Sequence, residues 1–151
     1  MARLSFRRLK KMAGQEVGLS DWTEITQNMI DAFADCTDDR QWIHVDEKRA
    51  GLDPQGGTVA HGFLLLSLLP HFNIRNQVFA SKFRMAVNYG LNRVRFVVPV
   101  KAGCRVRNRA LLKKVERRGF RKVLVTVDNS LEVEGQDKPA MVAEVLALIY
   151  L

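Results

Sequence analysis

The feature that most constrains the fold is an uncharged apolar run over residues 63–69, bounded by Gly62 and Pro70. The run is rich in leucine and holds no β-branched residue, which favours a helix, although periodicity alone does not separate a buried helix from a buried strand. Glycine and proline are common at helix boundaries. We therefore predict a buried helix that starts near Gly62 and ends near Pro70.

From residue 82 onward, apolar and polar residues alternate. Five segments with this pattern, separated by short turn-like stretches, are 82–88, 92–98, 104–116, 120–134 and 141–151. They are typical of an antiparallel sheet. Because neither the sheet nor the helix can bury its apolar face alone, we expect the sheet to wrap around a long central helix. The predicted fold class is α+β, in one domain over residues 1–151.

The size of the chain fits this prediction. A chain of 151 residues with 47% hydrophobic content can bury a stable core without the help of a bound metal or disulfide bonds. The sheet would still have an edge strand that needs cover, and a homodimer that continues the sheet would supply it.

The N-terminus and the cysteines indicate the cellular compartment of the protein. Cys36 and Cys104 lie far apart, without the spacing of a zinc site or a disulfide framework, so a reducing compartment fits best. The basic N-terminus lacks the apolar core of a secretory signal, and no run approaches the length of a membrane span. A transit peptide is one interpretation of residues 4–12, but apolar residues near helical spacing favour a short amphipathic helix. We expect a cytoplasmic protein with no membrane partner.

Positive charge is concentrated in one part of the chain. The net charge is +8, and residues 75–123 hold 15 Lys or Arg against one acid, Glu116. Such a field attracts phosphates. The alternative is a solvated strand face, because Arg105, Arg107 and Arg109 alternate with smaller or apolar residues. Few aromatic residues and no known nucleic-acid motif accompany the charge, so we expect a phosphorylated small ligand and no nucleic acid.

A first candidate for chemistry follows a predicted helix that Thr26 can cap and that ends near residues 35–37. Asp39 lies in the polar stretch after it, and His44 in a short piece, 42–45, that we predict to be extended. A carboxylate and an imidazole here can converge on one water molecule, as general acid–base hydration requires. Pairs with this spacing also occur by chance on surface loops.

A second candidate is Ala60-His61-Gly62-Phe63, at the start of the predicted central helix. A helix N-terminus presents unpaired N–H groups, and glycine allows a ligand carbonyl to approach them closely. Gly62 could therefore contribute to an oxyanion hole for a thioester enolate. The alternative for Gly62 is a tight turn before the helix. For His61 we prefer the alternative, a capping or packing role, to a role in chemistry.

Together the two segments resemble a known family. The run Phe-Ala-x-x-Thr-x-Asp-x-x-x-x-His-x-Asp, then a glycine-rich stretch and Ala-His-Gly-Phe, is similar to the MaoC-like dehydratases and (R)-specific enoyl-CoA hydratases, which have the hot-dog fold. The resemblance covers most of the chain from about residue 17. It implies that Asp39 and His44 are the catalytic dyad and that Gly62 supplies the oxyanion N–H.

The resemblance also implies a reaction, the reversible hydration of trans-2-enoyl-CoA to (R)-3-hydroxyacyl-CoA. No metal or other cofactor is expected, because the chemistry is proton transfer and coenzyme A is part of the substrate. Further candidates for contact with this acyl-CoA thioester substrate are His61, Phe63, Asn88, Tyr89 and Arg95. Arg95 could meet the phosphates of coenzyme A, whereas a core or sheet role for Asn88 and Tyr89 is as well supported. Gly90, next to them, is a possible bulge.

The chain departs from the commoner family pattern in two places. Gln41-Trp42 stands where many members have Asn-Pro, and Asp38 stands where many have glycine. These changes leave the dyad intact but place the pocket wall, and so the acyl chain length, in doubt.

Three other functions remain open. A hot-dog thioesterase would share the pocket, but residues 63–70 hold no acid, and Ser67 has no base paired with it in the sequence. The dehydratases of bacterial fatty-acid synthesis use a His-Phe-Pro-Gly type loop and a helical Glu, which this chain lacks. A non-catalytic acyl-CoA or nucleic-acid binding protein is the alternative from another class.

Overall fold

The computed structural model describes residues 4–54 and 56–151. Its helices are α1 (Phe6–Met12), α2 (Gln27–Thr37), α3 (Trp42–Val45), α4 (Glu47–Leu52), α5 (Gly62–Ser67) and α6 (Leu69–Asn73). Its strands are β1 (Gln15–Leu19), β2 (Thr23–Glu24), β3 (Met85–Phe96), β4 (Arg105–Arg117), β5 (Lys122–Val133) and β6 (Met141–Tyr150).

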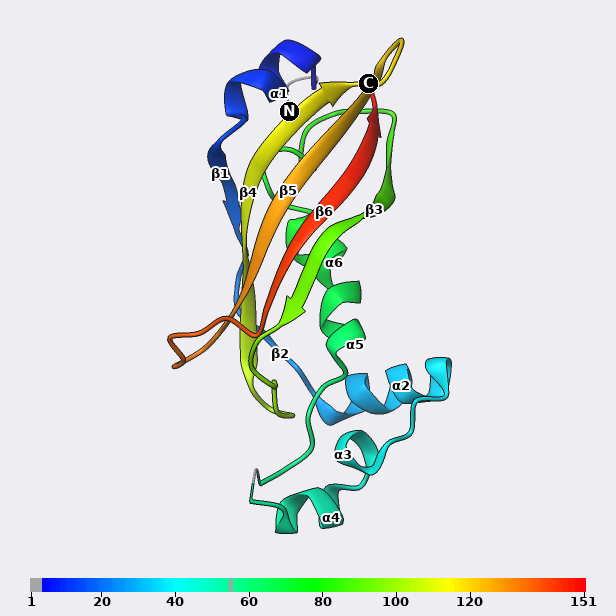
Figure 1. Ribbon diagram of the computed structural model, residues 1–151, viewed down its shortest axis with the longest axis vertical. Helices are drawn as coiled ribbons and strands as arrows, with labels where there is room; N and C mark the ends of the chain where they lie inside the picture. Colours follow the sequence, from blue (N-terminus) through cyan, green and yellow to red (C-terminus); the bar gives the residue numbers. More distant parts are fainter. Residues whose placement is uncertain (1–3, 55) are drawn as a thin grey trace.

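The strands form one antiparallel sheet in the order β1-β4-β5-β6-β3, with β2 also pairing with β4. Figure 1 shows α5 and α6 against one face of this curved sheet. The helices α2, α3 and α4 lie together beyond one end of it, and α1 lies at the other end. Within the described residues, no helix has the length and apolar character needed to cross a membrane.

The predicted central helix is present but divided. It starts at Gly62, as predicted, and after Leu68 the chain continues as α6 through Pro70 to Asn73. Pro70 has no N–H to donate to the carbonyl four residues earlier, which explains the break. As a residue of the first turn of α6, it needs no such bond. The prediction of one long helix ending near Pro70 is wrong in its length and at its end.

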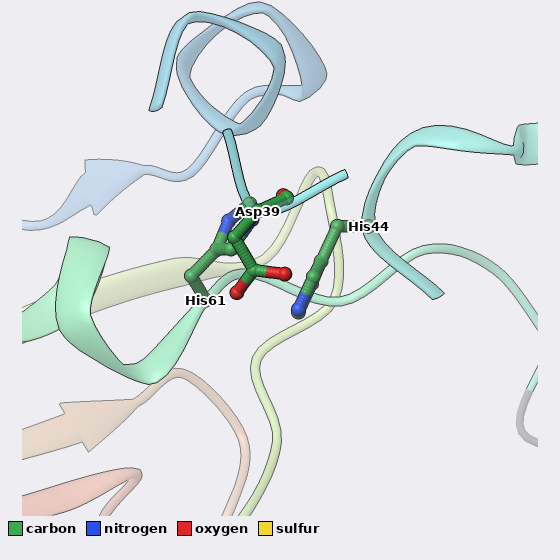
Figure 2. A group of neighbouring side chains, drawn as sticks. All are labelled: Asp39, His44 and His61. Carbon is green, nitrogen blue, oxygen red and sulfur yellow. The ribbon is translucent and has the colours of Figure 1, made fainter. Parts of the chain in front are cut away.

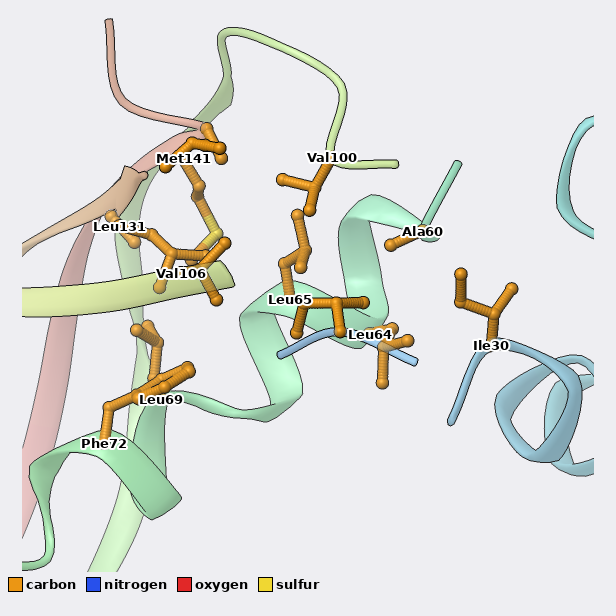
Figure 3. Packing of buried hydrophobic residues seen from close by; sticks show 14 residues of the cluster. Ile30, Ala60, Leu64, Leu65, Leu69, Phe72, Val100, Val106, Leu131 and Met141 are labelled. Atoms are coloured by element: carbon orange, nitrogen blue, oxygen red, sulfur yellow. The ribbon is translucent and has the colours of Figure 1, made fainter. Parts of the chain in front are cut away.

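The central helices and the sheet share one hydrophobic core (Figure 3). Leu64, Leu65 and Leu69 are at most 6% exposed. They belong to one cluster with residues from three strands of the sheet: Val106, Leu131 and Met141. Burial of each large side chain stabilises the fold by about 2 kcal/mol. The helix and the sheet therefore cover each other's apolar faces, as the sequence predicts.

The N-terminal segment forms the expected amphipathic helix. Ser5 caps α1, and its side chain accepts a hydrogen bond from the N–H of Arg8. Leu9 and Met12 are buried in a second cluster, against the other end of the sheet. This contact confirms the helix interpretation of residues 4–12.

The strand β3 corrects the sequence analysis. Residues 82–88 and 92–98 were predicted as two strands, but one continuous strand spans Met85–Phe96. Its pairing with β6 shifts register between Asn88 and Gly90 and again between Leu91 and Arg93. The first shift confirms the predicted bulge at Gly90. A bulge lets a strand bend without ending, so the turn-like residues here mark curvature.

The arginine-rich strand β4 lies beside acids that are distant in the sequence. Arg105, Arg107 and Arg109 are on the solvent side, which confirms the strand-face alternative. Arg105 pairs with Glu134, Arg107 and Arg109 both pair with Glu132, and Arg109 also pairs with Glu16. The positive charge of this strand is therefore largely compensated within the fold.

Candidate active site

The acid of the predicted dyad lies immediately after a strained turn. Thr26 caps α2 as predicted, accepting from the N–H of Met29, and the helix ends at Thr37. Asp38 then takes the left-handed conformation, with φ 60° and ψ 17°. Aspartate tolerates this conformation better than most residues, which explains how the chain turns here without glycine. The turn brings Asp39, which is half-buried, toward the histidines.

His44 is held at two points. Residues 42–45 form the helix α3, so the prediction of an extended piece is wrong. The imidazole is 6% exposed, and its Nδ1–H donates to the carbonyl of Val59 at 2.6 Å. The backbone carbonyl of His44 accepts from the side-chain amide of Gln27 at 2.8 Å. Because Val59 offers only an acceptor, Nδ1 carries the hydrogen of the neutral ring, and in that tautomer the lone pair is on Nε2.

Asp39, His44 and His61 form one cluster (Figure 2). One carboxylate oxygen and one ring nitrogen from each histidine all lie within 4.8 Å of one another. The geometry therefore places a carboxylate and an imidazole nitrogen close enough to share a water molecule.

The same three residues are poorly arranged for a metal ion. The rings of His44 and His61 are stacked, with centroids 3.7 Å apart and planes 24° from parallel. Their lone pairs therefore lie in two nearly parallel planes, whereas a tetrahedral metal needs lone pairs that point at one centre.

A departure from the family pattern contacts the acid directly. Gln41 stands where many members have asparagine, and its side-chain amide donates to Oδ1 of Asp39 at 3.2 Å. Gln41 thus orients the carboxylate and leaves its other oxygen available for a water molecule.

Gly62 is the first residue of α5. A β-carbon at this position would lie 2.9 Å from Cδ2 of Phe96, closer than packed atoms approach. Any larger residue here would force the ring of Phe96 to shift, a packing reason for glycine that the sequence does not reveal. Within the described residues, the Gly62 N–H has no hydrogen-bond acceptor, as expected in a first helical turn.

A cavity of about 1030 Å³ lies between the central helices and the sheet. Its walls are mostly apolar, and they include three predicted substrate contacts: Phe63, Asn88 and Tyr89. Phe33 connects the cavity to the cluster of Asp39, His44 and His61. It lines the cavity, and its ring lies 5.0 Å from the ring of His61. An acyl chain could therefore extend from the cluster into the cavity.

Within the described part of the chain, the other two predicted substrate contacts, Arg95 and His61, do not line the cavity. Arg95 is exposed on β3, where its guanidinium donates to the carbonyl of Val94, and it is not among the described residues that line the cavity. His61 precedes α5 but makes no side-chain cap to it. It is 3% exposed, which supports the packing alternative over the capping one.

Sequence reasoning missed Gln27, Val59 and Phe33. Gln27 is 17 residues from the His44 carbonyl that it holds, and Val59 acts through its backbone. Neither contact leaves a local pattern. Phe33 is the first residue of the family-like motif, with no role assigned to it there, and only the fold places it beside His61.

Comparison with known proteins decides the family. The family model for the MaoC-like domain matches residues 8–135. The chain is 50% identical over 137 residues to 3-hydroxyacyl-thioester dehydratase Z of Mycobacterium tuberculosis, which covers 90% of this chain and 89% of that protein. The chain belongs to the MaoC-like dehydratase family.

Solved structures agree on the fold. A monoamine oxidase regulatory protein from Archaeoglobus superposes with a TM-score of 0.82 at 23% identity, over 99% of this chain and 95% of that one. An (R)-hydratase from A. caviae superposes with a TM-score of 0.72 at 21% identity, over 89% and 94%. This MaoC-like chain has the predicted α+β hot-dog fold, and by its family it is a hydro-lyase.

Proposed function

We propose that the protein reversibly hydrates a trans-2-enoyl thioester to an (R)-3-hydroxyacyl thioester, with Asp39 and His44 as its catalytic residues. The observation that carries this proposal is the convergence of the two side chains within 4.8 Å, with His44 held by Val59 in the tautomer that leaves Nε2 free. The (R) configuration rests on the family resemblance.

In the hydration direction, the Asp39 carboxylate and Nε2 of His44 each accept a hydrogen bond from one water molecule. Nε2 of His44 takes a proton from the water as the water oxygen bonds to the β-carbon and the π electrons move toward the thioester carbonyl. His44 then returns that proton to the α-carbon as the carbonyl re-forms, so the net change is the addition of water. Proton transfer alone suffices, and the proposal needs no metal or redox cofactor.

The thioester carbonyl gains negative charge during this step. The N–H of Gly62, in the first turn of α5, is the donor that we assign to it. His61, the residue before Gly62, belongs to the catalytic cluster, so the carbonyl site and the water site are neighbours along the chain.

The substrate assignment rests on the cavity and on the relatives. The relative with 50% identity is named a 3-hydroxyacyl-thioester dehydratase. The apolar cavity of about 1030 Å³, lined in part by Phe63, Asn88 and Tyr89, suits an acyl chain. We assign coenzyme A as the carrier, with its phosphates near Arg95. Both cysteines are free thiols, which supports a cytoplasmic location.

A thioesterase is a weaker alternative. The hydroxyl of Ser67 donates to the carbonyl of Leu64 at 2.7 Å, a local bond within the helix, and no base contacts it in the described residues. A non-catalytic acyl-CoA or nucleic-acid binding protein would not need the Val59 carbonyl to fix the tautomer of His44.

The test of the reaction is an assay of purified protein with crotonyl-CoA and a longer trans-2-enoyl-CoA. We expect the absorbance of the conjugated thioester to fall while no free thiol is released. Thiol release at the same rate would instead favour hydrolysis, and binding without either change would favour a non-catalytic acyl-CoA protein.

A further inference from the structure

His61 contacts both members of the dyad. Its Nε2–H donates to the backbone carbonyl of Asp39 at 2.9 Å, across 22 residues of sequence. Its ring stacks on that of His44 at 3.7 Å, and Phe33 lies 5.0 Å away. The side chain is 3% exposed, so water does not compete for these contacts.

The bond to Asp39 reaches the loop from another element, whereas the side-chain contacts of Asp38, Arg40 and Gln41 are local. Asp38, one residue earlier, has a positive φ of 60°, which is unfavourable for residues other than glycine. Gln41 orients the carboxylate of Asp39, but it lies on the same short loop. His61 is fixed instead to the start of α5, so its bond ties the loop to the central helix.

The other ring nitrogen of His61, Nδ1, indicates which tautomer the ring adopts. Nδ1 of His61 is buried and has no hydrogen-bond partner among the described residues. A hydrogen on Nδ1 would be a buried donor without an acceptor, at a cost of about 1–3 kcal/mol. The ring therefore fits as the Nε2–H tautomer, the opposite of the tautomer that Val59 imposes on His44.

We propose that His61 is a positioning residue that sets the distance between the Asp39 carboxylate and the His44 imidazole, through its Nε2–H bond and its stacked ring. This inference rests on the proposed hydration by that dyad. It replaces a substrate-binding role for His61 with an effect on the catalytic step alone.

The test compares three substitutions in the hydration assay. His61→Phe keeps a stacking ring but removes the donor, and we expect kcat to fall about 10- to 100-fold with KM changed less than about threefold, because small displacements of reacting groups are costly. His61→Gln places an amide N–H near the position of Nε2 and should retain most of kcat. His71→Gln, an exposed histidine on α6, is the matched control and should behave as wild type.

Hydrogen exchange supplies a readout that does not depend on activity. Without the bond to Asp39, backbone amides of residues 38–42 should exchange faster in His61→Phe than in His61→Gln or wild type. Unchanged kcat and exchange in His61→Phe would overturn the inference while leaving the proposed reaction intact. A rise in KM with kcat preserved would also overturn it, in favour of direct substrate contact.

A measurement on the unmodified protein covers the case in which the variants do not fold. Imidazole nitrogen chemical shifts from NMR should show His61 as the Nε2–H tautomer and His44 as the Nδ1–H tautomer. A hydrogen on Nδ1 of His61 would contradict the inference. If wild-type protein shows these tautomers but hydrates no enoyl thioester, the proposed reaction fails and the positioning contact stands.

Discussion

At the scale of single residues, Gly62 shows how packing and chemistry constrain one position. Its N–H is assigned to the thioester carbonyl, and every residue except proline has that group. What disfavours other residues is the ring of Phe96, 2.9 Å from where a β-carbon would lie. Phe96 is 46% exposed, so its ring can move at some cost.

Gly62→Ala should therefore lower the free energy of unfolding by about 1–3 kcal/mol, the usual cost of overpacking. Phe96→Leu in the same chain should restore much of the loss, which thermal or urea unfolding would measure. Gly51→Ala is the matched control, because Gly51 lies in α4 with nothing within 4 Å of its β-carbon position, and it should be neutral or stabilising. A fully stable Gly62→Ala single variant would show that Phe96 does not constrain this position.

The sequence predicts the dyad candidates but not the contacts that hold them. Asp39 and His44 belong to a motif with fixed spacing, so a pattern finds them. The Val59 carbonyl that sets the tautomer of His44 depends on how a segment 15 residues away folds back, and backbone groups leave no residue signature. The role of each histidine nitrogen could not be predicted for the same reason.

At the scale of elements, the β4 and β5 strands are joined by ion pairs on the solvent side of the sheet. Partial burial raises the pKa of Glu132, but hydrogen bonds from Arg107 and Arg109 outweigh it, so the pKa is lowered overall. The stabilisation from a lowered carboxyl pKa is complete above the pKa of the unfolded chain, about 4.3, and is lost as pH falls through the folded value.

Thermal unfolding from pH 7 to pH 3 should test this pairing. We expect Glu132→Gln to lower the Tm of the protein at pH 7 and to reduce the loss of Tm below about pH 4.3, because one group whose protonation opposes folding is gone. Glu24→Gln, on the short exposed strand β2, should leave the profile unchanged. Parallel acid profiles for wild type and Glu132→Gln would argue against the ion pairs as a source of stability.

The elements also show which patterns predict structure reliably. The strands β4, β5 and β6 lie within two residues of their predicted bounds, because alternation continues over 10 or more residues. The four residues of α3 are too few to show a period, and they were predicted as extended. Residues 82–88 and 92–98 were predicted as separate strands, but one strand continues through both, with the predicted bulge at Gly90.

At the scale of the whole molecule, β3 is an edge strand of 12 residues that pairs, among the described strands, with β6 on one side only. It carries exposed apolar side chains, Met85, Val87, Tyr89, Leu91 and Phe96, of which Val87, Tyr89 and Leu91 also line the cavity. The opposite edge, β1, has five residues. A long exposed apolar edge favours pairing with another strand, which supports the proposed homodimer through β3.

Light scattering after size exclusion should give twice the chain mass of 17.2 kDa for wild type. Leu91→Lys puts a charge on the β3 edge and should give the monomer mass. Leu19→Lys makes the same change on β1, where the leucine is 43% exposed, and should leave the dimer intact. The opposite pattern would place the interface on β1, and a wild-type monomer at tens of micromolar would exclude the dimer.

The measurement that tests the central claim most directly is crotonyl-CoA hydration by Asp39→Asn and His44→Ala. Both variants should stay folded and lose at least about 100-fold in kcat, since general acid–base groups contribute 10²–10⁴-fold. Asp21→Asn and His71→Gln, at exposed positions, should match wild type. Folded Asp39→Asn or His44→Ala protein with wild-type turnover would contradict the dyad and require another source for the water-activating base.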